Sequence, residues 1–390
     1  YTDPDVINSL PVSVLPEGGF NRETVYKMNS WDFRATASYN DVFNDTHIVN
    51  AYGGMEINSI DRVATSNQKV GVLYDMGQLG NYAYEYFKQA SEENNMYYSL
   101  SNGYSRDVAF FGTATYSYKG RYTLNGTVRY EGSNRLGRAR SARWLPTWNV
   151  AGAWNAHEEP WFYNTFKGKL SHATLKASYS LTGDKPAVTN SMVIIQAYNP
   201  WRPYSADKES GLEISNFANP ELTYEKKHEF NIGVDLGFLN NRINIVTDAY
   251  WRDNFDLMGY YYGELQGRQY ANTASMKSHG IEATISSQNI KSKDFQWNTD
   301  LTFAYNYTEI TDLMSVSRVI DLVSSSGYAR EGYPHRALFS FQFQGLNDEG
   351  IPQVINESGE TTTSDIYFQE YERLDHLKYE GPTEPTYTGN

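Results

Sequence analysis

The 390-residue sequence contains no cysteine, which excludes disulfide bonds, thiolate metal sites and cysteine nucleophiles. It also has little positive charge: 33 Lys and Arg residues stand against 46 Asp and Glu residues, and the net charge is −13. A nucleic-acid-binding protein needs a basic surface that displaces counterions from phosphates. The charge balance therefore argues against a nucleic-acid partner.

Long hydrophobic runs are missing as well. The longest, such as Met192-Val193-Ile194-Ile195, are about four residues long, whereas a membrane-spanning helix needs about 20 apolar residues in a row. The first residues, Tyr1-Thr2-Asp3-Pro4, do not start a basic segment with an apolar core, so no signal peptide is predicted. Two classes are left: a soluble β protein, or a membrane β-barrel, in which only every second residue has to be apolar.

What the sequence does contain is 33 Tyr, 18 Phe and 8 Trp residues and a strong alternation of apolar and polar residues. In the segment 31–40, the odd positions are apolar and the even positions are polar, which is the period of a strand with two different faces. The same pattern recurs along the chain. It predicts eleven strands, at 31–40, 46–57, 106–117, 121–131, 144–155, 172–182, 223–238, 242–252, 276–290, 295–308 and 337–346.

Strand length and loop length favour the barrel. Several predicted strands have the roughly 9 to 11 residues that a tilted strand needs to cross a bilayer. Short connections at 41–45, 118–120, 239–241 and 291–294 alternate over most of the chain with long ones at 58–105, 132–143, 183–222, 253–275 and 309–336, and the connection at 156–171 is of intermediate length. Outer-membrane barrels have short periplasmic turns and long extracellular loops. We therefore predict an all-β fold, an antiparallel transmembrane β-barrel.

Aromatic residues near the ends of predicted strands agree with this interpretation. Trp31 begins one strand, Trp251 ends another, and Trp144, Trp148 and Trp154 lie in a third. Trp and Tyr are enriched where a membrane meets water. The alternative is a soluble β-sandwich, whose core aromatics also alternate. Taken one strand at a time, that alternative is equally good, and only the combination with strand length and loop sorting favours the barrel.

The polar strand faces carry charged residues that we expect to line the lumen of the barrel. A Lys or Arg residue on the lipid face at mid-depth would cost roughly 2 to 4 kcal/mol, so the charged face should point inward. The alternative is the solvent face of a soluble sheet. The predicted lumen-facing residues are Arg129, Glu131, Asp235, Asp248, Arg252 and Asp300.

Aromatic clusters in the long connections are the candidate ligand-binding residues. An aromatic ring can stack on the apolar face of a sugar, while nearby amides and carboxylates bind its hydroxyl groups. The alternative is that these rings pack the loops against each other. The candidates are Tyr97, Tyr98, Tyr198, Trp201, Tyr204, Tyr260, Tyr261 and Tyr262.

Five stretches, in order, resemble the SusC-like family of TonB-dependent outer-membrane transporters. They are Arg121–Gly137 (RYTLNGTVRYEGSNRLG), Trp144–Trp154, Leu175–Asp184, Asn219–Asp235 and Lys277–Glu282, and the likeness covers about residues 100–350. Glu131 and Leu136 stand where the family's motif has Asp and Phe, which keeps the charge and the apolar character. Five matches in the family's order make the resemblance specific.

The resemblance implies a barrel of roughly 22 strands that is closed by a plug domain. The predicted eleven strands would be about half of it, so we expect an internal fragment of the barrel domain. In this interpretation residues 1–30 are an irregular lead-in, 31–346 hold barrel strands and extracellular loops, and 347–390 form an acidic loop region. The plug domain and the last strands are expected to be absent from these residues.

The resemblance also implies a function: import of an oligosaccharide, less often a peptide, across the bacterial outer membrane. The energy would come through the TonB–ExbB–ExbD complex, a SusD-like lipoprotein would cover the loops, and transporter–lid pairs often form dimers. The alternatives are a surface protein that binds glycans or peptides without transport, and a barrel enzyme. No zinc, phosphate-loop, dinucleotide or serine-nucleophile motif is present, so we predict no enzyme, no metal and no cofactor.

Overall fold

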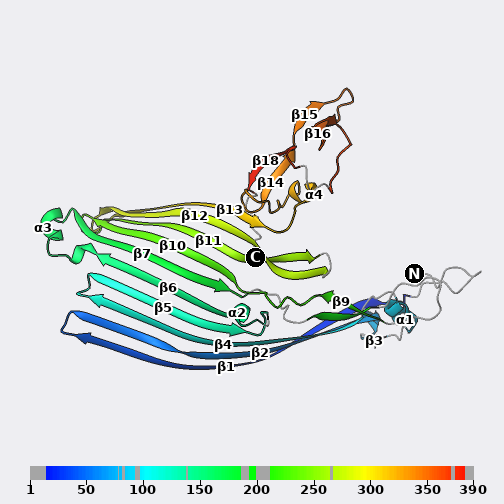
Figure 1. Ribbon diagram of the computed structural model, residues 1–390, viewed down its shortest axis with the longest axis horizontal. Coiled ribbons are helices and arrows are strands. Elements are labelled where there is room, and N and C mark those ends of the chain that lie inside the picture. The colour runs from blue at the N-terminus through cyan, green and yellow to red at the C-terminus, as the bar shows by residue number, and fades with distance from the viewer. Residues whose placement is uncertain are drawn as a thin grey trace, which may run out of the picture.

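The computed structural model describes residues 15–77, 79–80, 84–92, 97–137, 139–185, 193–198, 211–263, 267–369 and 374–382. A curved antiparallel sheet dominates it (Figure 1). Ten strands follow one another in the order β1-β2-β4-β5-β6-β7-β10-β11-β12-β13, and the short β3 pairs with β2. Their bounds are β1 Gly19–Phe43, β2 His47–Leu73, β3 Leu79–Gly80, β4 Tyr98–Tyr118, β5 Tyr122–Ser133, β6 Trp144–Asn155, β7 Leu170–Asp184, β10 Glu225–Phe238, β11 Ile243–Gly263, β12 Gly267–Lys291 and β13 Gln296–Leu313.

Helices are few and short. They are α1 Tyr84–Glu92, α2 Arg140–Arg143, α3 Phe162–Phe166, α4 Val319–Leu322 and the 3-10 turns η1 Tyr74–Met76 and η2 Ala156–Glu158. None of the helices in the described ranges has the length and apolar content required to cross a membrane. A separate hairpin is formed by β8 Ile194–Tyr198 and β9 Gly211–Asn216.

Tight turns gather at one end of the sheet, the end that carries α3 in Figure 1. Asn44 and Asp45, between β1 and β2, both have positive φ, at 49° and 54°. Asn and Asp tolerate this backbone, and a turn of this hand matches the twist of the flanking strands. The longer connections leave the opposite end, which we call the outer end. The predicted sorting of connections by length holds for the four short turns, but the long connection predicted at 253–275 is wrong, because β11 and β12 stay paired as far as Gly263 and Gly267.

Several segments predicted to be loops are instead strands that continue past the predicted ends. β2 runs to Leu73 and β4 begins at Tyr98, so much of 58–105 is paired backbone. β1 begins at Gly19, which corrects the irregular lead-in expected for 1–30. In these extensions the sequence alternates less clearly between apolar and polar residues. Backbone pairing between strands can continue in water, where neither face of the strand has to be apolar.

The strand predicted at 337–346 is not part of the large sheet. It divides into β14 Ala337–Phe341, which pairs with β18 Leu377–Pro382, and β15 Phe343–Leu346, which pairs with β16 Pro352–Ile355 and through it with β17 Thr361–Thr362. Phe339 and Phe341 serve a small separate core, in which Phe339 is buried with Val319, Leu322, Ala337 and Leu377, whereas Phe343 is exposed. Residues 347–390 therefore hold three short strands as well as loops, and this part projects beyond β13 (Figure 1).

Register divides the large sheet into two faces. Directly opposed residues of antiparallel neighbours share a face. One row across all ten strands is Tyr39, Ala51, Ala114, Gly126, Val150, Tyr179, Phe230, Trp251, His279 and Tyr307. The adjacent row on the other face is Asn40, Asn50, Thr115, Asn125, Ala151, Ser178, Asn231, Tyr250, Gly280 and Asn306. We call these the apolar face and the polar face.

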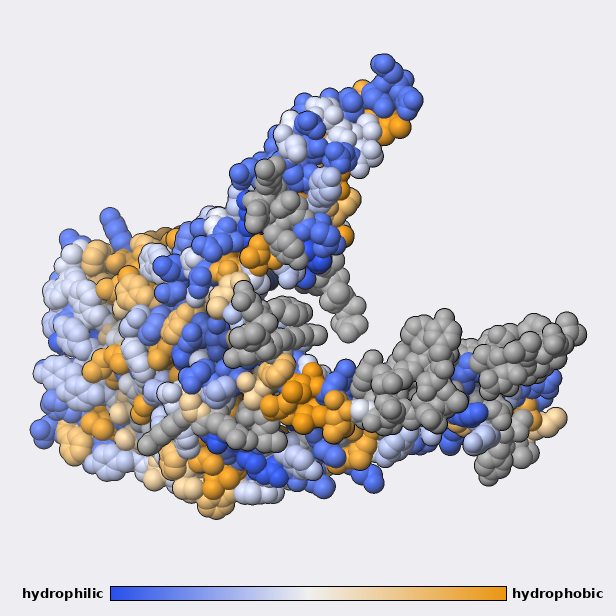
Figure 2. Space-filling view, turned by 45° about the vertical axis from the view of Figure 1, so that its right-hand side comes forward, coloured by the Kyte–Doolittle hydropathy of each residue, from blue (hydrophilic) through white to orange (hydrophobic). Residues whose placement is uncertain are grey.

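The apolar face leaves large hydrophobic side chains uncovered. Trp31 is 56% exposed, Leu124 is 56% exposed and Leu301 is 59% exposed. Figure 2 shows hydrophobic side chains interleaved with hydrophilic ones over the sheet and a mostly hydrophilic projecting part. Uncovered large apolar side chains on one face of a sheet suit contact with lipid rather than water.

Candidate functional site

The six charged residues predicted to share one side of the sheet do share it. Arg129 and Glu131 on β5, Asp235 on β10, Asp248 and Arg252 on β11 and Asp300 on β13 all have the same strand parity as the polar row. This placement is consistent with the expected lumen-facing role. Side chains of a strand point alternately to its two faces, and no bulge interrupts the register of these central strand segments. Residues of the same parity therefore lie on the same face.

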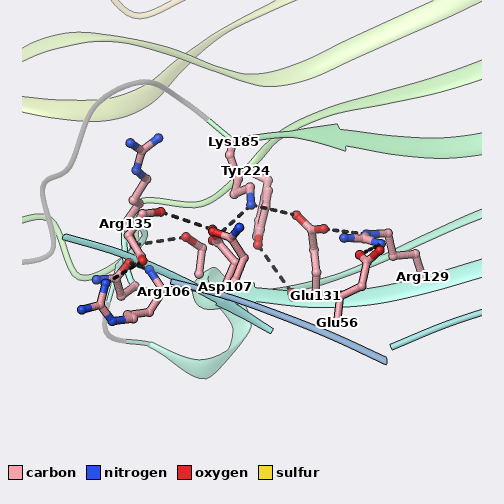
Figure 3. Close-up of polar contacts among 12 residues, drawn as sticks. Glu56, Arg106, Asp107, Arg129, Glu131, Arg135, Lys185 and Tyr224 are labelled. Atoms are coloured by element: carbon pink, nitrogen blue, oxygen red, sulfur yellow. Dashed lines mark hydrogen bonds and ion pairs between the residues drawn. The ribbon is translucent and has the colours of Figure 1, made fainter. Parts of the chain in front are cut away.

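Arg129 is the centre of a chain of ion pairs on the polar face (Figure 3). Its Nη1 lies 2.9 Å from Glu56 Oε2 and its Nε lies 2.7 Å from Glu131 Oε2. Glu56 in turn contacts Arg34, with Nε to Oε1 at 3.3 Å. The guanidinium fork of Arg129 thus bridges carboxylates of β2 and β5, two strands that are separated by β4.

The chain continues to Lys185, which follows the last residue of β7. Its Nζ lies 3.7 Å from Glu131 Oε1 and 3.1 Å from Asp107 Oδ1. Three positive and three negative residues therefore alternate across the polar face: Arg34, Glu56, Arg129, Glu131, Lys185 and Asp107. Each of these six charges has a partner of opposite sign, so the charges of this row of ion pairs sum to zero.

Two of the motifs that carry the family resemblance pack together beside this chain. The turn after β5 contacts the segment before β10: Gly137 N–H donates to Leu222 O at 2.9 Å, and the Tyr224 hydroxyl donates to Glu131 O at 3.4 Å. Leu136, Leu145 and Tyr224 form a buried hydrophobic cluster. Burial raises the pKa of the Tyr224 hydroxyl, so it stays a neutral donor.

The other charged residues of the polar face lie away from that chain. Asp235 pairs with Lys176. Arg252 Nε lies 2.9 Å from Glu229 Oε2, and its guanidinium stacks 3.9 Å from the centre of the Tyr250 ring. The side chains of Asp248 and Asp300 make no hydrogen bond or ion pair with the described residues, although both residues are paired in the sheet through their backbone.

The predicted aromatic residues whose side chains the structure describes do not form one cluster. Tyr97 packs on Phe87 of α1, with ring centres 4.7 Å apart, and Tyr98 begins β4. Tyr198 is the last residue of β8, and Trp201 and Tyr204 lie outside the described residues. Tyr97 thus fits the packing alternative, although its side chain is still 42% exposed.

Tyr260, Tyr261 and Tyr262 lie on β11 and not in a loop, because β11 and β12 stay paired as far as Gly263 and Gly267. Tyr260 packs against Tyr270 of β12, with ring centres 4.4 Å apart and ring planes tilted by 31°, and the two hydroxyl groups are hydrogen-bonded. Tyr260 and Tyr261 line a cleft of about 1330 Å³ at the outer end of the sheet. We call this the outer cleft.

Glu56, Asp107 and Lys185 belong to the site but were not singled out from the sequence. Glu56 and Asp107 have the right parity within predicted strands, so the alternation itself could have identified them. Lys185 lies just beyond a strand end, and only the folded sheet places it between two carboxylates of β4 and β5.

We expect Arg129→Gln to destabilise the full-length protein by about 1–2 kcal/mol, since it removes two charge-assisted hydrogen bonds and leaves Glu56 and Glu131 with one cation each, Arg34 and Lys185. The measurement is the urea unfolding midpoint. Adding Glu56→Gln should restore part of the loss by removing one of the two carboxylates. Strictly additive effects of the two substitutions would contradict the ion-pair chain.

Comparison with known proteins agrees with this architecture. Residues 18–365 match the family described as TonB dependent receptor-like, beta-barrel. TonB-dependent receptor P26 of Formosa agariphila is 24% identical over 334 residues, which are 81% of this chain and 31% of that protein. TonB-dependent receptor SusC of Bacteroides thetaiotaomicron is 28% identical over 214 residues, which are 53% of this chain and 21% of that protein.

The structure of the RagAB peptide transporter has the same fold, with a TM-score of 0.72 at 22% sequence identity. The likeness covers 94% of this chain and 40% of that one. This chain therefore spans less than half of that structure and 31% or less of the two curated relatives. Its open ten-stranded sheet is the expected shape for part of a barrel. The chain belongs to the TonB dependent receptor-like β-barrel family, whose members are proteins of the bacterial outer membrane.

Proposed function

We propose that the full-length protein imports an oligosaccharide across the outer membrane, with energy supplied through TonB–ExbB–ExbD and with a SusD-like lipoprotein over its outer end. The observation that supports a transporter wall most directly is the separation of an apolar and a polar face across all ten strands. A lipid-facing outside and a polar inside are what a barrel that passes polar solutes requires.

In this proposal the polar face is the lumen wall, and the six charged residues on it contact water, substrate or a plug domain. The tight-turn end is periplasmic and the outer end is extracellular. A plug domain would gate the lumen, as the family resemblance implies, and no residue of the barrel would do covalent chemistry. Substrate contact by the exposed Tyr residues at the outer end is part of the same proposal.

Import of peptides is the second candidate, because the solved structure with a TM-score of 0.72 is that of a peptide transporter. At 22% sequence identity, the likeness to this structure is evidence for a shared fold and not for a shared substrate. A surface protein that binds glycans without transporting them is the third candidate. These three functions predict different uptake results.

The test is uptake in the source bacterium, comparing wild type, a strain that lacks the full-length gene and the complemented strain. We expect fluorescent oligosaccharides to accumulate inside wild-type cells and not inside the deletion strain. A protonophore should abolish accumulation, because TonB coupling uses the proton gradient. Surface binding that survives both the protonophore and a wash, without accumulation, would indicate a non-transporting protein. Accumulation of labelled peptides in place of sugars would establish the peptide alternative.

A further inference from the structure

The outer cleft lies between the outer ends of β11, β12 and β13 and the segment that contains α4. Its volume of about 1330 Å³ exceeds the roughly 300–1,000 Å³ of pockets that hold drug-sized ligands, so several sugar rings fit. Hydroxyl groups and aromatic rings are frequent on its walls. They include Tyr260, Tyr261, Thr273, Ser275, Ser315 and Tyr328.

Basic side chains line this cleft, although the whole chain carries −13. Arg318 and Arg336 line it, and His335 stands beside Arg336, whereas the one acidic lining residue among those described is Glu225. Glu225 Oε1 already accepts a hydrogen bond from Met258 N–H at 2.8 Å. Arg318 is paired with Asp321, so the exposed guanidinium of Arg336 is the positive group on this wall that can attract an anionic ligand.

Arg336 is the cation that is available to a ligand. Arg318 uses its guanidinium on Asp321 and Gln369, with contacts of 2.9 and 2.8 Å. Arg336 makes no hydrogen bond or ion pair within the described part of the chain, and its side chain is exposed. Its backbone lies in the left-handed region, with φ at 56°, which is costly for a residue with a Cβ and is frequent at functional sites.

The strand edge beside the cleft is already occupied. Ile310 N–H donates to Tyr333 O at 3.0 Å, and Gly332 N–H donates to Ile310 O at 2.9 Å, so the chain's own segment covers β13 there. Extended peptides are often bound by adding a strand to a free sheet edge. This cleft offers side-chain hydroxyls, rings and a cation at that place, which suits a sugar better than a peptide backbone.

We infer that the outer cleft binds an anionic sugar ring of an oligosaccharide. Arg336 binds its carboxylate or sulfate group, and the exposed ring of Tyr260, held in place by Tyr270, supports the sugar face. This inference rests on the proposed function and narrows it to acidic oligosaccharides. It assigns the charged contact to a residue outside the aromatic clusters that the sequence singled out.

The test is calorimetric binding to the purified full-length protein, with tetragalacturonate and its methyl ester as matched ligands and neocarratetraose sulfate as a sulfated ligand. The ester keeps the rings and loses the charges. We expect a charged ligand to bind about tenfold more tightly than the ester, the effect of one charge-assisted hydrogen bond. Arg336→Gln should abolish that difference, and Arg336→Lys should restore part of it.

Lys293→Gln is the matched control, because Lys293 is an exposed cation in the turn at the opposite end of the sheet. It should leave all affinities unchanged. Tyr260→Ala should weaken charged and neutral ligands alike. Equal affinity for acid and ester, no binding of either, or displacement by a peptide would overturn the inference. Import of neutral oligosaccharides with no charge preference would overturn it while the proposed transport function stood.

Discussion

Val150→Arg should prevent most of the full-length protein from folding into the outer membrane. Val150 lies on the apolar face between Gly126 and Tyr179 and is 49% exposed. A guanidinium that faces the middle of a bilayer costs about 2–4 kcal/mol, which is a large part of the stability of a typical domain. The readout is heat-modifiability on gels of membrane fractions, since a folded barrel migrates differently before boiling.

Asn149→Arg provides the control for that experiment, because Asn149 is the next residue along the same strand. It lies on the polar face, opposite Thr127 and Ser180. We expect this variant to fold like the wild type, since the new charge meets water and polar neighbours. Equal damage from the two substitutions would mean that the assignment of the two faces is wrong.

The second large effect is expected at Gly137, where the turn after β5 passes the backbone before β10. A Cβ atom there would lie 2.0 Å from Pro220 O and 2.6 Å from Pro220 C, so one of the two segments would have to move. We expect Gly137→Ala to destabilise the full-length barrel by about 1–3 kcal/mol, the usual cost of overpacking. The urea unfolding midpoint measures this.

Gly126→Ala is the comparison for Gly137→Ala. A Cβ at Gly126 meets nothing within 4 Å, and Gly126 lies inside β5. Because glycine in a strand interior is entropically unfavourable, Ala should be neutral or slightly stabilising there. Two variants that lose stability equally would show that the close contact at Gly137 does not hold the two motifs together.

The strands that touch both lipid and lumen could be predicted from the sequence, because both environments act on alternate residues of one segment. Ten of the eleven predicted strands are found in the large sheet. The strand at 337–346 was wrong for a related reason. Phe339, Phe341 and Phe343 show the same alternation, although Phe339 and Phe341 pack in a small separate core and Phe343 is exposed.

The candidate site could be predicted only in part. The parity of Arg129 and Glu131 follows from the alternation, so their common face was predictable. Their partners were not, because Glu56 is 73 residues away from Arg129 in the sequence and comes into reach only through the register of β2, β4 and β5. The ligand candidates were placed in loops, whereas the Tyr260 segment is paired strand.

By itself, the sequence determined the fold class, the two faces of the long strands and the family, since each depends on local periodicity or on motifs of contiguous residues. The tertiary structure alone decided which charges meet, where the two motifs pack and what lines the outer cleft. Those features depend on the pairing register between strands and on segments far apart in the chain. A one-residue slip in register would carry every side chain of a strand to the other face, and no local pattern contains that information.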